Sequence, residues 1–141
     1  MLETIQTVNV PTIMIVEDNQ EHRQELQAIL DKNFNNFYNL AMLNDGKAAV
    51  DFFTKNIKAI KLIILNALLR QLDCDIAIAR IKKIESWEDI KSPAHVPIII
   101  VYDDCKINLD KLKDVSYDAG FEYPLVENKF LKEVEHCLQR K

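Results

Sequence analysis

The sequence contains only two glycines, Gly46 and Gly120, among its 141 residues. Nucleotide and flavin sites on α/β folds usually need a loop rich in Gly, Ser or Thr directly after the first strand. The first predicted strand covers residues 12–16, and neither glycine follows it. The scarcity of glycine therefore argues against a nucleotide- or flavin-dependent enzyme.

Cysteine is also scarce, and its pattern excludes two kinds of stabilised domain. The three cysteines, Cys74, Cys105 and Cys137, are far apart and form no CxxC pair. A disulfide framework or a zinc site would need an even number or close ligand pairs. We expect free thiols, buried or half-buried.

Long apolar runs and basic clusters are lacking as well. No segment approaches the roughly 18 apolar residues of a membrane span, and residues 1–10 do not resemble a signal peptide. The formal net charge is −4, and no cluster of Lys or Arg stands out. We expect a cytoplasmic protein that binds neither membrane nor nucleic acid, and whose partner is another protein.

What the sequence does contain is an alternation of apolar runs with helical patterns. The runs that predict strands are 12–16, 38–43, 61–65, 97–101 and 122–126. Apolar residues at helical spacing predict helices at about 20–32, 74–81, 112–119 and 130–138. A further predicted helix has Ala49, Phe52 and Phe53 on one face and ends at about Asn56. Such repeated strand–helix units favour an α/β fold, a doubly wound five-stranded parallel sheet of flavodoxin-like order 2-1-3-4-5 with helices on both faces. The predicted domain covers residues 11–141, after an N-terminal extension of residues 1–10.

Several local signals refine this prediction. Asn19 is a suitable N-cap for the first helix, and Gly120 is suited to end the fourth helix in left-handed geometry. Pro124 would place the fifth strand at a sheet edge. The polar stretch 85–95, with Trp87, is typical of a loop.

Functional groups in such sheets gather beyond the carboxyl ends of the strands. Polar residues at those positions are Glu17, Asp18, Asn66, Tyr102, Asp103 and Glu127. The adjacent carboxylates of Glu17 and Asp18 are typical oxygen ligands of Mg²⁺.

At these residues the sequence resembles the receiver domains of response regulators in two-component signalling. Residues 13–19, Ile-Met-Ile-Val-Glu-Asp-Asn, are similar to that family's first strand and acidic pair. Residues 69–74 resemble its Leu-Pro-x-x-Asp-Gly loop, and 96–100 resemble its fourth strand. Residues 120–126 are similar to the fifth-strand segment. The resemblance covers about residues 11–138.

Three departures fall on the phosphorylation machinery that this resemblance implies. Asn66 stands where the family has its phosphoryl-accepting Asp, and Tyr102 stands where it has Thr or Ser. Glu127, followed by Asn128, stands where it has Lys-Pro. A neutral amide cannot form the same aspartyl phosphate, and a carboxylate repels the phosphoryl group that a lysine would neutralise. The hypothesis is a pseudo-receiver whose degenerate phosphoacceptor pocket comprises Glu17, Asp18, Asn66, Tyr102 and Glu127.

No cofactor is expected. A weakened Mg²⁺ site at Glu17, Asp18 and Asn66 stays open beside the alternative of a solvated acidic pocket. The resemblance implies a stand-alone, non-enzymatic signalling domain that works by protein–protein interaction. Its partner would be a histidine kinase, another regulator or an output protein, or a second copy in a homodimer. The implied interaction face contains Leu109, Leu112, Tyr117, Tyr123, Lys129 and Lys132.

Two other functions stay open. One is a receiver fold controlled by a metal or a small ligand. The other is a small enzyme on a flavodoxin-like fold, although a phosphoaspartate phosphatase would carry Asp-x-Asp where this chain has Glu17-Asp18-Asn19.

Overall fold

A computed structural model describes residues 10–34, 37–67, 73–88, 96–103 and 117–139. Some of the predictions above fall elsewhere in the chain: the loop at 69–72, Cys105, Leu109, Leu112 and most of the predicted helix at 112–119 lie outside the described residues.

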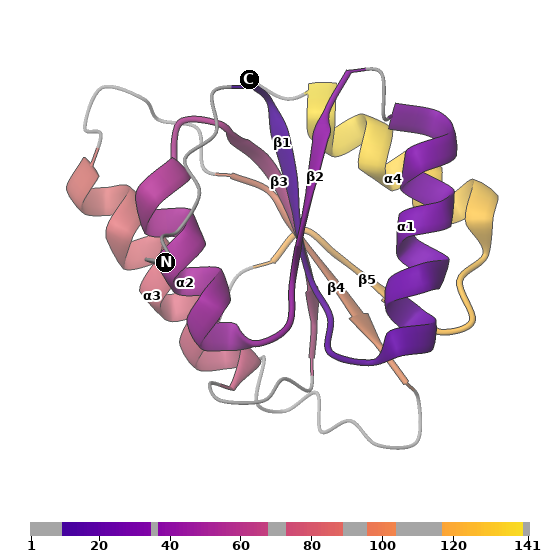
Figure 1. Cartoon of the computed structure of the whole chain (residues 1–141), viewed down its shortest axis with the longest axis horizontal. Helices are drawn as coiled ribbons and strands as arrows, with labels where there is room; N and C mark the ends of the chain where they lie inside the picture. Colours follow the sequence, from indigo (N-terminus) through magenta and orange to yellow (C-terminus); the bar gives the residue numbers. More distant parts are fainter. Residues whose placement is uncertain (1–9, 35–36, 68–72, 89–95, 104–116, 140–141) are drawn as a thin grey trace, which may run out of the picture.

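The described chain contains one sheet of five parallel strands in the order β2-β1-β3-β4-β5, which confirms the predicted doubly wound topology (Figure 1). The strands are β1 (Thr12–Val16), β2 (Asn39–Leu43), β3 (Ile60–Asn66), β4 (Ile98–Tyr102) and β5 (Ala119–Glu122). β2 and β5 form the two edges, and β1, β3 and β4 lie between them.

The inner strands are continuous apolar runs because both faces of the sheet are covered. In β1, successive side chains point to opposite faces. Ile13 and Ile15 pack in one buried cluster, and Met14 and Val16 pack in the other. All five residues of β1 are buried, so no position of the strand can be polar without an internal hydrogen-bond partner.

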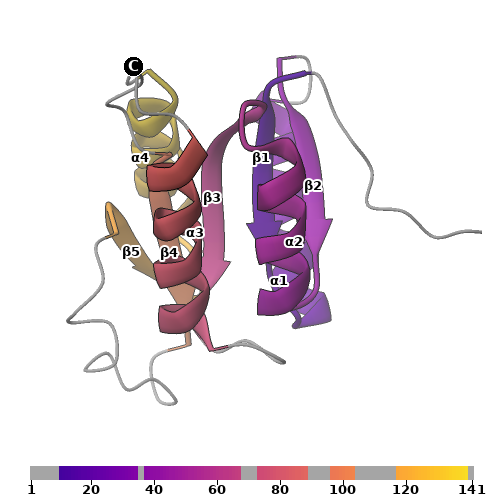
Figure 2. The same cartoon turned by 90° about the vertical axis from the view of Figure 1, so that its left-hand side faces the viewer.

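Two of the described helices cover each face of the sheet (Figures 1 and 2). Helices α1 (Gln20–Phe34) and α4 (Glu127–Gln139) pack on the side of Ile13 and Ile15. Helices α2 (Gly46–Asn56) and α3 (Cys74–Glu88) pack on the side of Met14 and Val16. None of the described helices combines the length and apolar character that crossing a membrane requires.

Side-chain caps determine where two helices begin. Asn19 is the predicted cap of α1, and its Oδ1 accepts a hydrogen bond of 2.9 Å from the His22 backbone N–H. Asp45 caps α2 in the same way, since its Oδ1 accepts from the Ala48 N–H at 2.7 Å. Each cap satisfies a donor that would have no partner in the first turn of a helix.

The fifth strand was predicted at the wrong residues. Gly120 does not end a helix; it lies within β5, opposite Ile100 of β4, and no described glycine has a positive φ. Ala119 is likewise in the strand, and Pro124 follows it. Residues 119–122 form the strand because they pair with β4. Ala and Gly are unfavourable strand residues, so the local sequence did not indicate a strand there.

A second boundary also differs. α3 continues to Glu88, so residues 85–88 belong to the helix and not to the predicted loop, and Trp87 lies near the helix end.

The core packing predicts a large cost for truncating α2. Phe53 is fully buried between α2 and the sheet, so Phe53→Ala should lower the free energy of unfolding by about 3–5 kcal/mol. Phe37 is the matched control, because its side chain is 72% exposed and Phe37→Ala should change stability by less than about 0.5 kcal/mol. Urea unfolding followed by circular dichroism measures both, and equal effects would contradict the packing described here.

Burial also predicts how stability varies at alkaline pH. It raises the pKa of the Cys74 thiol from 9.0 to about 12, and the Asp75 and Asp73 carboxylates add to the rise. Between these values the unfolded chain has lost the thiol proton and the folded chain keeps it. The Cys74 contribution to the free energy of unfolding is therefore intact below pH 9 and declines as pH rises from 9 towards 12.

In Cys74→Ala the free energy of unfolding should decline less steeply above pH 9, by at most about 1.4 kcal/mol per pH unit. Urea unfolding on either side of pH 9 tests this, and parallel curves for the variant and the natural protein would speak against it.

Candidate functional site

Polar side chains from four strand ends and one helix meet at the carboxyl edge of the sheet. Because the strands are parallel, their carboxyl ends lie at the same edge (Figure 2). We call this group the Glu17 cluster. Its members are Glu17 after β1, Asn66 at the end of β3, Asp103 after β4, Tyr123 after β5 and His22 in the first turn of α1.

The Glu17 side chain is fully buried, and its carboxylate is surrounded by donors. Asn66 Nδ2 lies 2.7 Å from both Oε1 and Oε2. The Tyr123 hydroxyl donates to Oε1 at 2.8 Å, and the Asn19 backbone N–H donates to Oε2 at 3.0 Å. A buried carboxylate is costly without such partners, so these contacts are what allows Glu17 to lie inside the protein.

Asn66 is buried at the end of β3 and faces Glu17 with its amide nitrogen. An aspartate here would put a second acceptor beside the Glu17 carboxylate. The amide instead supplies a hydrogen-bond donor, so the residue at the position where the resemblance implies a phosphoacceptor stabilises the Glu17 carboxylate.

Tyr123 is the member of the cluster that the sequence prediction placed elsewhere. Its ring is buried among the side chains between the sheet and helices α1 and α4, and its hydroxyl reaches Glu17. Burial raises the pKa of this hydroxyl above its ordinary range, and the Glu17 charge raises the pKa further. Tyr123 therefore stays a protonated donor at any physiological pH.

His22 is the helical member of the cluster, and no motif in the sequence points to it. Its ring stacks on Tyr123 with centroids 3.6 Å apart and planes at 8°. Its Nε2 lies 3.5 Å from Asp103 Oδ1, and its buried Nδ1 lies 3.9 Å from Glu17 Oε1, too far for a hydrogen bond. The imidazole thus covers the outer side of the Glu17–Tyr123 contact.

Three residues predicted for this pocket, Glu127, Tyr102 and Asp18, are not members of the cluster. Glu127 begins α4, and its Oε2 lies 3.1 Å from Lys32 Nζ; the Lys32 side chain is exposed and Glu127 is half-buried. Tyr102 is half-buried and packs on the opposite face of the sheet, among the residues under α2 and α3. Asp18 follows Glu17 and is half-buried.

The correction of Glu127 follows from the true end of the fifth strand. The Lys-Pro pair that the resemblance implies comes directly after that strand, and β5 ends at Glu122. The resemblance therefore implies Tyr123-Pro124, and not Glu127-Asn128, as the pair at the Lys-Pro position. Pro124 was the signal in the sequence, but it was assigned to the strand interior.

The described residues do not fit a Mg²⁺ site as they are arranged. Oxygen ligands from several acidic residues would have to face the ion, whereas the Glu17 oxygens face an amide nitrogen and a hydroxyl donor. Within the described parts of the chain, no group of three or more His, Cys, Asp or Glu is placed to hold a metal.

No protein-family model matches the sequence, and no curated protein does either. Solved structures do. The chain is similar to the N-terminal domain of a response regulator/sensory box/GGDEF 3-domain protein from Carboxydothermus hydrogenoformans. The identity is 20% and the TM-score 0.73, over 91% of this chain and 94% of that chain.

It is also similar to the signal receiver domain of an HD domain-containing protein from Pseudomonas fluorescens Pf-5, at 20% identity, with a TM-score of 0.74 over 93% of this chain and 96% of that one. A response regulator receiver domain protein from Clostridium thermocellum has 16% identity and the same TM-score and coverage. The α/β architecture is therefore that of receiver domains. The chain has the flavodoxin-like receiver fold that the sequence resemblance predicts.

The Glu17 cluster predicts a measurable cost for removing one hydroxyl. Tyr123→Phe leaves the buried Glu17 carboxylate with one donor fewer, so the free energy of unfolding should fall by about 1–3 kcal/mol. Tyr117→Phe is the control, because that side chain is 37% exposed, and it should change stability by less than about 0.5 kcal/mol. Urea unfolding at neutral pH compares them; the cluster has no structural role if both variants match the natural protein.

Proposed function

We propose that this chain is a receiver-fold signalling domain that acts by protein–protein interaction and is not phosphorylated at residue 66. The observation that carries the proposal is the contact of Asn66 Nδ2 with both Glu17 oxygens at 2.7 Å. Asn66, at the proposed phosphoacceptor position, is a donor that already forms hydrogen bonds with Glu17, the first residue of the acidic pair. In this proposal the chain is cytoplasmic and is not an enzyme.

The charges and donors of the cluster support this reading. A receiver domain that accepts a phosphoryl group needs a metal and a cationic side chain to neutralise it, as the resemblance implies. Here Tyr123 takes the place of the lysine and stays neutral, because burial raises the pKa of its hydroxyl. The Glu17 charge is stabilised by donors within the protein, so we propose that the domain needs no Mg²⁺ to keep its folded state.

The proposed interaction face lies on the β5–α4 side of the fold. Tyr117, Lys129 and Lys132 are exposed there, and Val126 is 59% exposed. Tyr123 was predicted for this face, but it is buried and belongs to the Glu17 cluster. The partner we propose is a histidine kinase, another regulator or an output protein, with a homodimer as a further form of the same contact.

Treatment with a small phosphodonor and Mg²⁺, followed by intact mass, tests the central claim. The natural protein should show no phosphoryl adduct. An adduct that maps to the carboxyl edge of the sheet would contradict the proposal. Asn66→Asp in parallel shows whether this one residue blocks the chemistry.

The same variant tests the electrostatics. Asn66→Asp should lower the free energy of unfolding at neutral pH by about 3 kcal/mol, because it removes a donor from a buried carboxylate and adds a like charge. Mg²⁺ should restore much of this loss, since a cation can then lie between two carboxylates. Stability of the natural protein should not depend on Mg²⁺.

Asn56→Asp is the matched control for this experiment. Asn56 is also buried, but its amide donates to the Phe52 carbonyl oxygen within α2. This variant should be destabilised without a response to Mg²⁺. An equal Mg²⁺ response in both variants would indicate non-specific ion binding and remove the support for the pocket.

A further inference from the structure

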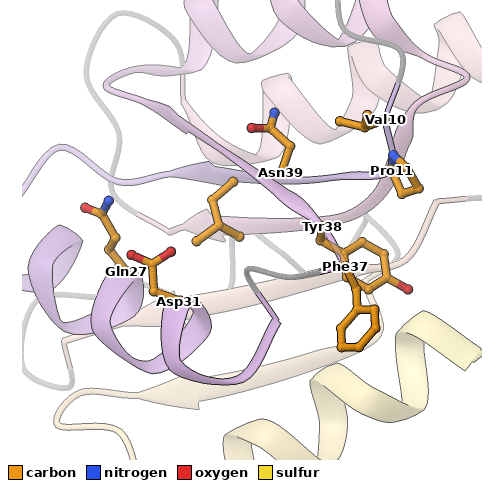
Figure 3. A pocket seen from close by; sticks show the side chains of 8 residues that line it. Val10, Pro11, Gln27, Asp31, Phe37, Tyr38 and Asn39 are labelled. Carbon is orange, nitrogen blue, oxygen red and sulfur yellow. The ribbon is translucent and has the colours of Figure 1, made fainter.

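A groove on the other side of the molecule is independent of the Glu17 cluster and of the proposed β5–α4 face. It has a volume of about 570 Å³ and runs between α1 and the start of edge strand β2; we call it the α1–β2 groove. Figure 3 shows Gln27 and Asp31 of α1 towards one end, and Phe37 and Tyr38 towards the other. Its volume is in the range of sites that enclose a side chain or a small ligand.

The groove combines exposed aromatic surface with acceptors and one negative charge. Phe37 is 72% exposed, the largest exposure among the exposed large apolar side chains of the described chain. Asp31 lies opposite on α1, with the amide of Gln27 one turn earlier. None of the described residues that line the groove is Lys, Arg or His. A carboxylate and an open aromatic ring together favour a cation, because the ring face also attracts positive charge.

The nearest basic residue in the sequence does not neutralise Asp31. Lys32 is adjacent, but its Nζ lies 3.1 Å from Glu127 Oε2 of α4. The ion pairs found in the described residues do not include Asp31. Asp31 is exposed and has no ion-pair partner among the described residues, so its carboxylate is accessible to a cation.

The backbone of β2 supplies a second, independent feature. β2 pairs with β1 on one side only, and no described strand lies against its other side. The Asn39 N–H donates to the Pro11 carbonyl oxygen and the Leu43 carbonyl oxygen accepts from Glu17, so these residues face β1. Backbone groups alternate along a strand, so Leu40 and Met42 direct theirs to the open edge.

We infer that the α1–β2 groove binds an extended, basic peptide segment of a partner protein. The segment pairs with the open edge of β2 and places an Arg or Lys side chain between Asp31 and Phe37. An open edge strand beside a side-chain pocket is the arrangement used in recognition by strand addition.

A second copy of this chain fits the groove less well. Residues 37–46, which include β2, contain no Lys or Arg, so pairing of β2 with another β2 would bring no cation to Asp31. It would also bring together two chains that each carry a formal net charge of −4. Charge therefore favours a basic partner over self-association.

Fluorescence anisotropy with short labelled peptides tests the inference on the full chain. The first peptide alternates Arg with Val, the second replaces Arg by Glu, and the third keeps Arg but carries N-methyl groups on alternate residues. The natural protein should bind the first peptide and not the second. The N-methylated peptide should bind about tenfold more weakly, because it keeps the charges but loses backbone hydrogen bonds to β2.

Variants of the groove locate the binding. Asp31→Asn and Phe37→Ala should each weaken binding of the basic peptide by about three- to fivefold. Glu135→Gln is the matched control, because it removes an exposed negative charge on α4 and should leave binding unchanged. Circular dichroism melting confirms that each variant is folded.

Several results would overturn the inference. If Asp31→Asn and the natural protein bind the basic peptide equally well, the peptide is bound by negative charges outside the α1–β2 groove. Equal binding of the basic and N-methylated peptides would exclude strand addition. Sedimentation that shows a dimer weakened by Phe37→Ala would identify a second copy as the occupant.

Discussion

The buried carboxylate of Glu17 is the constraint on which the rest of this site depends. A carboxylate removed from water needs hydrogen-bond donors within the protein, because its desolvation costs roughly several kcal/mol even after the interior relaxes. Here the donors come from the end of β3, from the residue after β5 and from the backbone at the start of α1. One charge therefore joins three separate parts of the chain at the carboxyl edge of the sheet.

The receiver fold can neutralise the acidic residue at this edge in two ways. One is an external cation shared with a phosphoacceptor carboxylate, as the family resemblance implies. The other is the set of internal donors found here, with Asn66 and Tyr123 directed at Glu17. The internal donors contact the same Glu17 oxygens that a cation would otherwise bind.

Much of the fold could be predicted because the apolar runs and helical stripes of this chain are strong local signals. β1 and β4 are buried on both faces, and their sequences are continuous apolar runs. β5 is different: its four residues, Ala-Gly-Phe-Glu, are alternately half-buried and exposed, so no apolar run marks them. Its position comes from pairing with β4. Because the strand was predicted to end too late, the pocket residue after it was predicted to be Glu127, whereas Tyr123 contacts Glu17.

The sequence by itself determined the class of fold, the Asn19 cap and the meeting of Glu17 with Asn66, because each depends on hydrophobic periodicity, local capping or the shared direction of parallel strands. Only the tertiary structure decided which residue faces Glu17 from the fifth strand, how His22 stacks on Tyr123, and which edge of the sheet lies open beside Asp31. These contacts join residues that are far apart along the chain, up to 106 positions for Tyr123 and Glu17. No local pattern specifies them, since they follow from the register and end of each strand in the packed sheet.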